Sequence, residues 1–188
     1  MDPNLLRGNL VRLAALGRSD APMIARWSED TSYMRLQDTH AALPRTAEQV
    51  TGELEQLNDG HNAIAFAIRT LSDDALIGTV GFYEIEWSNS TAWLGIGIGE
   101  RANWGKGFGT EALWLALRYA FDELNFYRLT VTVIATNSRA IALYERAGFQ
   151  REGVFREFGL RDGRRYDMLL YGLLRPEWKV RLGDGEQR

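Results

Sequence analysis

Apolar residues recur along this chain with two periods, period two in some runs and the helical period in others, which is typical of strands interleaved with helices. Five runs predict strands, at residues 10–13, 63–70, 75–87, 91–99 and 128–135. The short polar segments "LSDD" and "SNS" join the three middle runs and leave no room for a crossover, so we expect antiparallel pairing there. Near the C-terminus, Asp162-Gly163 between two strand-like runs predicts a hairpin.

Apolar residues at helical spacing predict four helices among these strands. The first follows Asp20, and the second begins at Thr46, which has a glutamine at capping-box spacing. The third follows a glycine-rich loop and has apolar residues on one side from Leu113 to Leu124. The fourth begins after Asn137 as its N-cap and ends at Gly148.

Composition limits the classes of function. At 188 residues, with 45% hydrophobic and 25% charged residues, the chain is expected to form one domain over residues 1–180, with a disordered tail at 181–188. A net charge of −3 argues against a nucleic-acid partner, because such a surface needs clustered Lys and Arg. The apolar runs are too short to span a bilayer, so we expect no membrane partner and a cytoplasmic, bacterial-type protein.

The cysteine and histidine content excludes further kinds of site. The chain has no cysteine, which excludes disulfides, thiolate metal sites and a cysteine nucleophile. The only histidines, His40 and His61, lie in separate loop-like stretches, so we expect no metal.

Three alternate glycines, Gly105, Gly107 and Gly109, stand immediately before the third predicted helix. Glycine is unfavourable inside helices and strands, so the cluster serves either a sharp connection or the close approach of a ligand to the backbone. A loop of small residues that leads into a helix turns several N–H groups outward at the positive end of the helix dipole. With Lys106 among the glycines, the segment favours a phosphate or pyrophosphate site over a tight turn.

Two common phosphate motifs fit this loop poorly. A Walker loop requires Ser or Thr after its lysine, and here Gly107 follows Lys106. The segment from Gly107 to Ala112 matches a permissive dinucleotide-binding pattern, but that pattern needs an acidic residue at the end of the next strand. The next strand ends in "IATN", so a dinucleotide-binding protein is only a remote alternative.

The segment "NWGKGFGTEAL", followed one helix and one strand later by "NSRAIALYERAGF" and "REG", resembles the GNAT N-acetyltransferases. The branch it resembles comprises the ribosomal-protein N-terminal acetyltransferases and the spermidine N-acetyltransferases. The resemblance includes the opening "LVRLAALGRSDAPMIARW" and the terminal "LRDGRRYDMLL", and so covers almost the whole chain. It implies an α/β fold in which a mixed, mostly antiparallel sheet is splayed at an acetyl-CoA cleft and flanked by helices.

The resemblance also implies where acetyl-CoA binds. We expect the pyrophosphate on the backbone amides that precede the third helix, and the pantetheine arm against a strand backbone and Asn137. The implied residues are Gly97, Ile98 and Gly99 for pantetheine, and Gly105, Lys106, Gly107, Phe108, Gly109 and Thr110 for the pyrophosphate. The family usually has Arg or Gln where this chain has Trp104, so a side-chain contact there is in question, and the charge of Lys106 is expected to compensate in part.

The chemistry of amine acetylation assigns further roles. Without cysteine no acetyl-cysteine intermediate can form, which favours direct transfer from the thioester to the amine. By the resemblance Tyr144 meets the CoA sulfur, and its hydroxyl is expected to protonate the departing thiolate. A main-chain N–H near Ile98 is the expected oxyanion donor. Glu84, on a strand beside the expected cleft, is the candidate general base, with Glu86 on the same face and water as alternatives.

Together these features predict an acetyl-CoA-dependent N-acetyltransferase that acts on a primary amine, either a protein N-terminus or a small amine such as a polyamine. A non-catalytic CoA-binding domain is the alternative from another class. The sequence leaves the acceptor open, and we expect loops around 28–45 and 155–166 to select it. The chain is also compatible with a homodimer.

Overall fold

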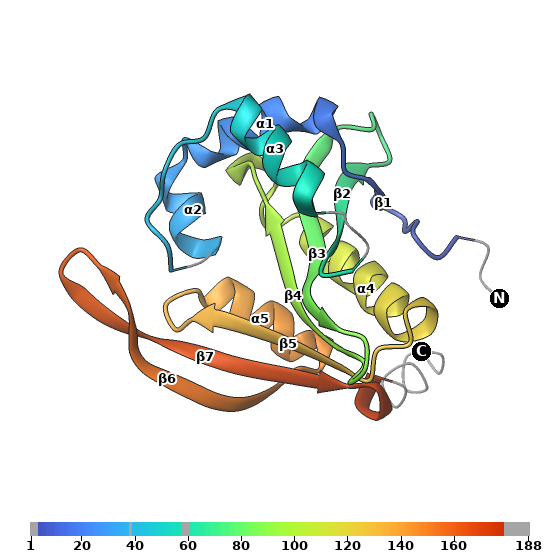
Figure 1. The fold of residues 1–188 in the computed structure, drawn as a ribbon, viewed down its shortest axis with the longest axis vertical. Coiled ribbons are helices and arrows are strands. Elements are labelled where there is room, and N and C mark those ends of the chain that lie inside the picture. Colours follow the sequence, from blue (N-terminus) through green and yellow to red (C-terminus); the bar gives the residue numbers. More distant parts are fainter. Residues whose placement is uncertain (1–3, 38, 58–60, 179–188) are drawn as a thin grey trace.

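The computed structural model describes residues 4–37, 39–57 and 61–178, so the tail expected at 181–188 lies outside the described residues. They form a seven-stranded sheet in the order β1-β2-β3-β4-β5-β7-β6, with helices against it (Figure 1). The strands are β1 (Val11–Ala15), β2 (Ile64–Thr70), β3 (Leu76–Glu86), β4 (Thr91–Ile98), β5 (Arg128–Ile134), β6 (Gln150–Arg161) and β7 (Arg164–Leu174). The helices are α1 (Ala21–Ser28), α2 (Thr31–Gln37), α3 (Ala47–Leu57), α4 (Phe108–Arg118) and α5 (Ser138–Ala147). None of the described helices is long and apolar enough to cross a membrane.

Strands β4 and β5 are paired over only three residues. From β1 to β4 every neighbouring pair is antiparallel, as the short connections predict for β2 to β4, whereas β4 and β5 run parallel. Their register extends from Thr91↔Arg128 to Trp93↔Thr130, and the two strands then diverge, as Figure 1 shows. On its other edge β5 pairs with β7 along its whole length. The sheet is therefore open between β4 and β5, and we call this opening the sheet split.

Apolar side chains form separate cores on the two faces of the sheet. Leu94 of β4 and Val131 of β5 belong to the larger core, together with Leu113 of α4 and Tyr144 of α5. Ala67 of β2 belongs to a second cluster, against which apolar residues of α1 and α3 pack. Helices α4 and α5 therefore cover one face, and α1 and α3 cover the other.

Local sequence signals correctly predict several element ends. Gln49 N–H donates to Thr46 Oγ1 (3.2 Å) and Thr46 N–H donates to Gln49 Oε1 (2.9 Å), which is the predicted capping box. Asp162 and Gly163, with φ of 50° and 72°, form the predicted turn between β6 and β7.

Two loop predictions are wrong in part. Within 28–45, residues 31–37 form the helix α2, which has no strong apolar period to reveal it. Within 155–166, residues 155–161 belong to β6, and residues 164–166 to β7.

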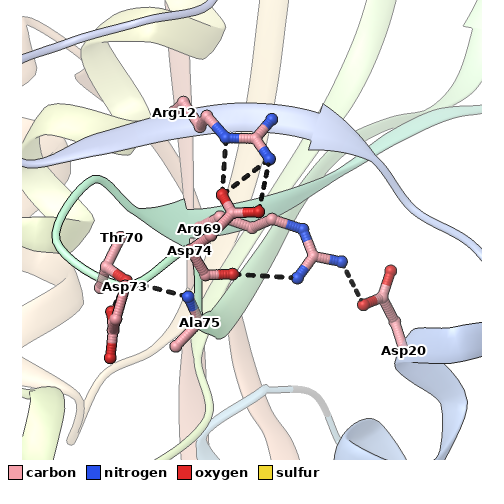
Figure 2. A network of polar contacts seen from close by, with 7 residues as sticks. All are labelled: Arg12, Asp20, Arg69, Thr70, Asp73, Asp74 and Ala75. Atoms are coloured by element: carbon pink, nitrogen blue, oxygen red, sulfur yellow. Dashed lines mark hydrogen bonds and ion pairs between the residues drawn. The ribbon is translucent and has the colours of Figure 1, made fainter.

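Asp20, predicted to open α1, joins this helix to the sheet. One of its carboxylate oxygens accepts a hydrogen bond from Gly17 N–H (3.0 Å), and the other pairs with Arg69 of β2 (2.5 Å). Figure 2 shows Arg69 also reaching the carbonyl of Asp74, beside the Arg12–Asp74 ion pair. The side chain of Asp20 is 5% exposed and that of Asp74 is 61% exposed. The Asp20–Arg69 pair is thus the buried member of this network.

We expect Asp20→Ala to lower the free energy of unfolding by about 3 kcal/mol, because it leaves the mostly buried guanidinium of Arg69 without its partner. Asp74→Ala removes an exposed partner from the same network and should cost about 0.5 kcal/mol. Urea unfolding of both variants measures the two losses. Equal losses would contradict this ranking of the two ion pairs.

Candidate active site

Two cavities meet at the sheet split. The larger, about 550 Å³, extends along β4 to α2, α5 and the glycine loop, which we define as residues 104–109. The smaller, about 150 Å³, lies between the diverging parts of β4 and β5. The residues that line both cavities are Leu36, Gln37, Ile96, Asn137 and Ala140. We call the two cavities together the cleft.

The glycine loop has the backbone geometry of an anion site. Gly105 and Gly107 have φ of 74° and 88°, in the left-handed region that favours glycine, and Gly107 is the N-cap of α4. Both residues line the larger cavity, as do Gly109 and Thr110. The cavity therefore faces the first turn of an eleven-residue helix, where backbone N–H groups and the helix dipole favour an anion.

Trp104 fastens the glycine loop to the end of β4. Its indole N–H donates to the carbonyl of Ile98 at 2.7 Å. The guanidinium of Arg139, at the start of α5, lies 4.4 Å from the centroid of the same ring. Trp104 thus joins three of the elements around the larger cavity. Trp104 itself anchors the glycine loop, and Arg139 places a positive charge against the Trp104 ring.

Alternate residues of β4 turn their backbone groups to opposite edges of the strand. Gly99 N–H donates to the carbonyl of Ile77 in β3 at 2.9 Å, so Gly97 and Gly99 face β3. Ile96 and Ile98 therefore present their backbone groups to the sheet split. Of the three residues predicted to pair with pantetheine, only Ile98 faces the cleft in this way.

Helix α5 brings two predicted residues to the cleft. Asn137 caps the helix, since its Oδ1 accepts a hydrogen bond from Ala140 N–H at 3.1 Å, and the prediction of this N-cap is confirmed. Tyr144 lines the smaller cavity and is 6% exposed. Burial raises the pKa of its hydroxyl to about 12, so the group is protonated throughout the neutral range.

Helix α2 supplies the opposite wall, which the sequence pattern did not predict. A Cβ atom on Gly97 would lie 2.7 Å from Tyr33 Oη and 2.6 Å from Gln37 Oε1, so only glycine leaves room for these side chains. A Cβ atom on Gly99 would lie 2.1 Å from the ring of Trp27 in α1. The glycines of β4 thus allow close packing of α1 and α2 on this face. The side chains of the intervening residues pack into the larger core on the other face.

The β6–β7 hairpin is tied to the end of α2. Arg161 donates to the carbonyls of Thr39 and His40 at 3.2 and 3.0 Å, and Arg35 of α2 pairs with Asp162 at 2.8 Å. The two segments predicted to select the acceptor are therefore in direct contact.

Glu84 is not brought to the cleft. It is exposed, has φ of 48°, and lies in a β-bulge where the β3–β4 register shifts between Tyr83 and Glu86. Neither glutamate lines either cavity, and Glu86 accepts a hydrogen bond from Asn89 at 2.7 Å. The role of Glu84 as general base stays a prediction, and its position lends it no support.

Sequence reasoning also missed two cationic residues at the cleft. Arg139 and Arg146 of α5 line the larger cavity. The two arginines are seven residues apart, or about two helical turns, so they lie on the same side of α5. This spacing is the sequence signal that could have identified them. Among the residues that the structure describes, no Asp, Glu or His lines either cavity, and no group of three such residues could hold a metal ion.

The chain belongs to the GNAT acetyltransferase family, because a family model described as "Acetyltransferase (GNAT) domain" matches residues 11–150. An "Uncharacterized N-acetyltransferase p20" of Bacillus licheniformis is 32% identical over 163 residues, which are 85% of this chain and 89% of that protein. A ribosomal protein uS5-alanine N-acetyltransferase of Escherichia coli (strain K12) is 29% identical over 128 residues, 68% of this chain and 66% of that protein. The crystal structure of spermidine N-acetyltransferase from Vibrio cholerae, in complex with CoA and spermine, has a TM-score of 0.82 and 25% identity over 90% of this chain and 98% of that chain.

These findings confirm the predicted fold class and reaction. The chain has the GNAT fold and is an N-acetyltransferase that uses acetyl-CoA to acetylate an amine. The findings therefore favour an enzyme over the two alternatives from the sequence analysis, a non-catalytic CoA-binding domain and a dinucleotide-binding protein. A homodimer and a cytoplasmic location stay predictions.

We expect Asn137→Ala to lower the free energy of unfolding by about 1 kcal/mol, because it removes the capping bond to Ala140. Asn137→Ser keeps an oxygen at the cap and should stay within about 0.3 kcal/mol of the wild type. Thermal unfolding of the two variants compares the losses. A loss of the same size in both would show that the cap bond is not what Asn137 contributes.

Proposed function

We propose, with membership of this acetyltransferase family as the premise, that the acetyl group passes directly from the thioester to the amine within the sheet split. The smaller cavity is the observation that carries this proposal. Tyr144 of α5 and the capping residue Asn137 line one side of it, and Leu36 and Gln37 of α2 line the other. The split thus connects the two faces of the sheet, so that acetyl-CoA and the amine would each enter from a different face. The amine nitrogen bonds to the acetyl carbon, the carbon–sulfur bond breaks, and the amine gives its proton to solvent.

On the side of α4 and α5, the residues present fit acetyl-CoA, which supplies the activated thioester when bound. The backbone amides from Gly105 to Thr110 would hold the pyrophosphate at the N-terminus of α4. Ile96 and Ile98 would pair with the amides of the pantetheine arm in place of a strand. The Nδ2 group of Asn137 is a further donor to the arm, because the cap bond uses only its Oδ1.

The charged groups of the larger cavity suit the remaining phosphate of CoA. Arg139 and Arg146 lie on the same wall as Asn137 and bring two positive charges to this end of the cleft. Lys106, exposed in the glycine loop, adds a third.

Tyr144 and the backbone of β4 would stabilise the charges that develop during transfer. The hydroxyl of Tyr144 would donate a hydrogen bond to the departing sulfur, while the N–H of Ile96 or Ile98 would face the oxyanion. With the pKa of Tyr144 raised to about 12 and that of a thiol near about 8.5, a hydrogen bond is favoured over complete proton transfer. The expected general acid therefore becomes a donor to the thiolate.

We expect Gly107→Val to weaken CoA binding by at least about tenfold, because the side chain would strain a φ of 88° and cover the amides at the start of α4. Gly163→Val is the matched control, since its φ of 72° lies in the hairpin turn away from the glycine loop. It should lose stability without losing affinity. Calorimetric titration with CoA measures both, and unchanged affinity in Gly107→Val would refute the pyrophosphate assignment.

We expect Tyr144→Phe to lower kcat by roughly 10²–10³-fold with little change in the Kd of CoA, because it removes only the hydrogen-bond donor to the sulfur. The ratio of wild-type to variant kcat should stay constant through the neutral range. It should shrink as the pH approaches about 12, where the wild-type hydroxyl ionises and can no longer donate. Tyr127→Phe, at a residue 52% exposed, serves as the control. A near-normal kcat in Tyr144→Phe would make Tyr144 a wall residue.

A further inference from the structure

Two neutral polar groups of α2 meet the bare backbone of β4 inside the cleft. Tyr33 Oη and Gln37 Oε1 both stand over Gly97, at the positions where its missing side chain would point. Both residues line the larger cavity, and Gln37 also lines the smaller one at the split. They lie on the face of the sheet opposite α4 and α5, so the acetyl-CoA residues do not account for them.

The charged side chain that acts electrostatically on the hydroxyl of Tyr33 is a cation, Arg45. Leu36, Ile96 and Trp93 are the apolar neighbours of the pair along the cleft walls. The cations of the larger cavity, Arg139 and Arg146, belong to α5. In the part of the chain that the structure describes, no carboxylate lines either cavity. Burial raises the pKa of Tyr33 far above its usual range, so its hydroxyl stays neutral.

A site with neutral oxygen atoms and no carboxylate favours a neutral amine over an ammonium group. The nucleophilic amine must be neutral to attack, and Gln37 Oε1 and Tyr33 Oη can each accept a hydrogen bond from its N–H. The second ammonium group of a polyamine, only a few bonds from the first, would lose its hydration without gaining a carboxylate partner. In a peptide the group next to the terminal amine is a neutral amide. This amide can hydrogen-bond to both the NH₂ donor and the carbonyl acceptor of a glutamine side chain.

We infer that Tyr33 and Gln37 form the acceptor subsite and that the acceptor is the N-terminal amine of a polypeptide rather than a polyamine. This inference rests on the proposed function, because it places the amine opposite the thioester across the sheet split. Gln37 selects the acceptor by its neutrality, and Tyr33 holds the amine beside β4.

Steady-state acetylation of two acceptors, a hexapeptide with a free N-terminal alanine and spermidine, tests the inference. Tyr33 is buried and Gln37 is exposed, so an ammonium group would be desolvated here only when both substrates are bound. We expect the wild type to prefer the peptide in kcat/KM by at least about 100-fold, the discrimination that one desolvated, unpaired charge can produce. Tyr33→Phe and Gln37→Ala should each raise the KM of the peptide up to about tenfold, with the Kd of CoA unchanged. Gln37→Glu should move the preference toward spermidine by about tenfold, because it supplies the missing carboxylate.

Gln56→Glu, on the exposed side of α3, adds the same charge away from the cleft and should leave the preference unchanged. Equal or better use of spermidine by the wild type would overturn the inference while leaving acetyl transfer intact, as would a preference that Gln37→Glu does not move. Should neither amine be acetylated, titration of each into the CoA-saturated protein decides the same question. Tighter binding of the peptide supports the subsite, and tighter binding of spermidine overturns it.

Discussion

The divergence of β4 from β5 after three paired residues is the constraint on which the rest of the cleft depends. If the ladder continued, the backbone groups of Ile96 and Ile98 would bond to β5, and Tyr144 would have no cavity to line. Each strand is held by its other neighbour, β4 by β3 and β5 by β7, so the opening leaves both halves of the sheet ordered. The indole of Trp104 then fixes the free end of β4 to the glycine loop.

The open split gives the two faces of the sheet different electrostatic characters. The face of α4 and α5 offers helix N-terminal amides and the guanidinium groups of Arg139 and Arg146, which suit the phosphates of CoA. On the face of α2, the neutral side chains of Tyr33 and Gln37 lie over Gly97, where β4 has no side chain. Under the proposed function, an anionic donor and a neutral amine would approach one gap from opposite sides, and the backbone of β4 would be common to both.

Features set by local chemistry were predictable from the sequence. The capping box at Thr46, the turn at Asp162-Gly163 and the left-handed glycines before α4 each depend on a few adjacent residues. The sheet split depends on contacts between distant segments, and it was predicted by the family resemblance and not by a local pattern. Helix α2 was not predicted at all. The glycines of β4 are the instructive case, because the pantetheine contacts of Gly97 and Gly99 stay predictions while both glycines make room for side chains, those of Tyr33 and Trp27. At Glu84 a bulge ends the regular strand from which its place beside the cleft was predicted.

Both substrates are expected to occupy the split at the same time, one from each face. Initial rates measured over a matrix of acetyl-CoA and peptide concentrations test this most directly. The predicted result is a set of intersecting double-reciprocal lines, because a ternary complex must form before the acetyl group moves. Parallel lines would show that the acetyl group leaves CoA before the acceptor binds, and that result would contradict direct transfer across the sheet split.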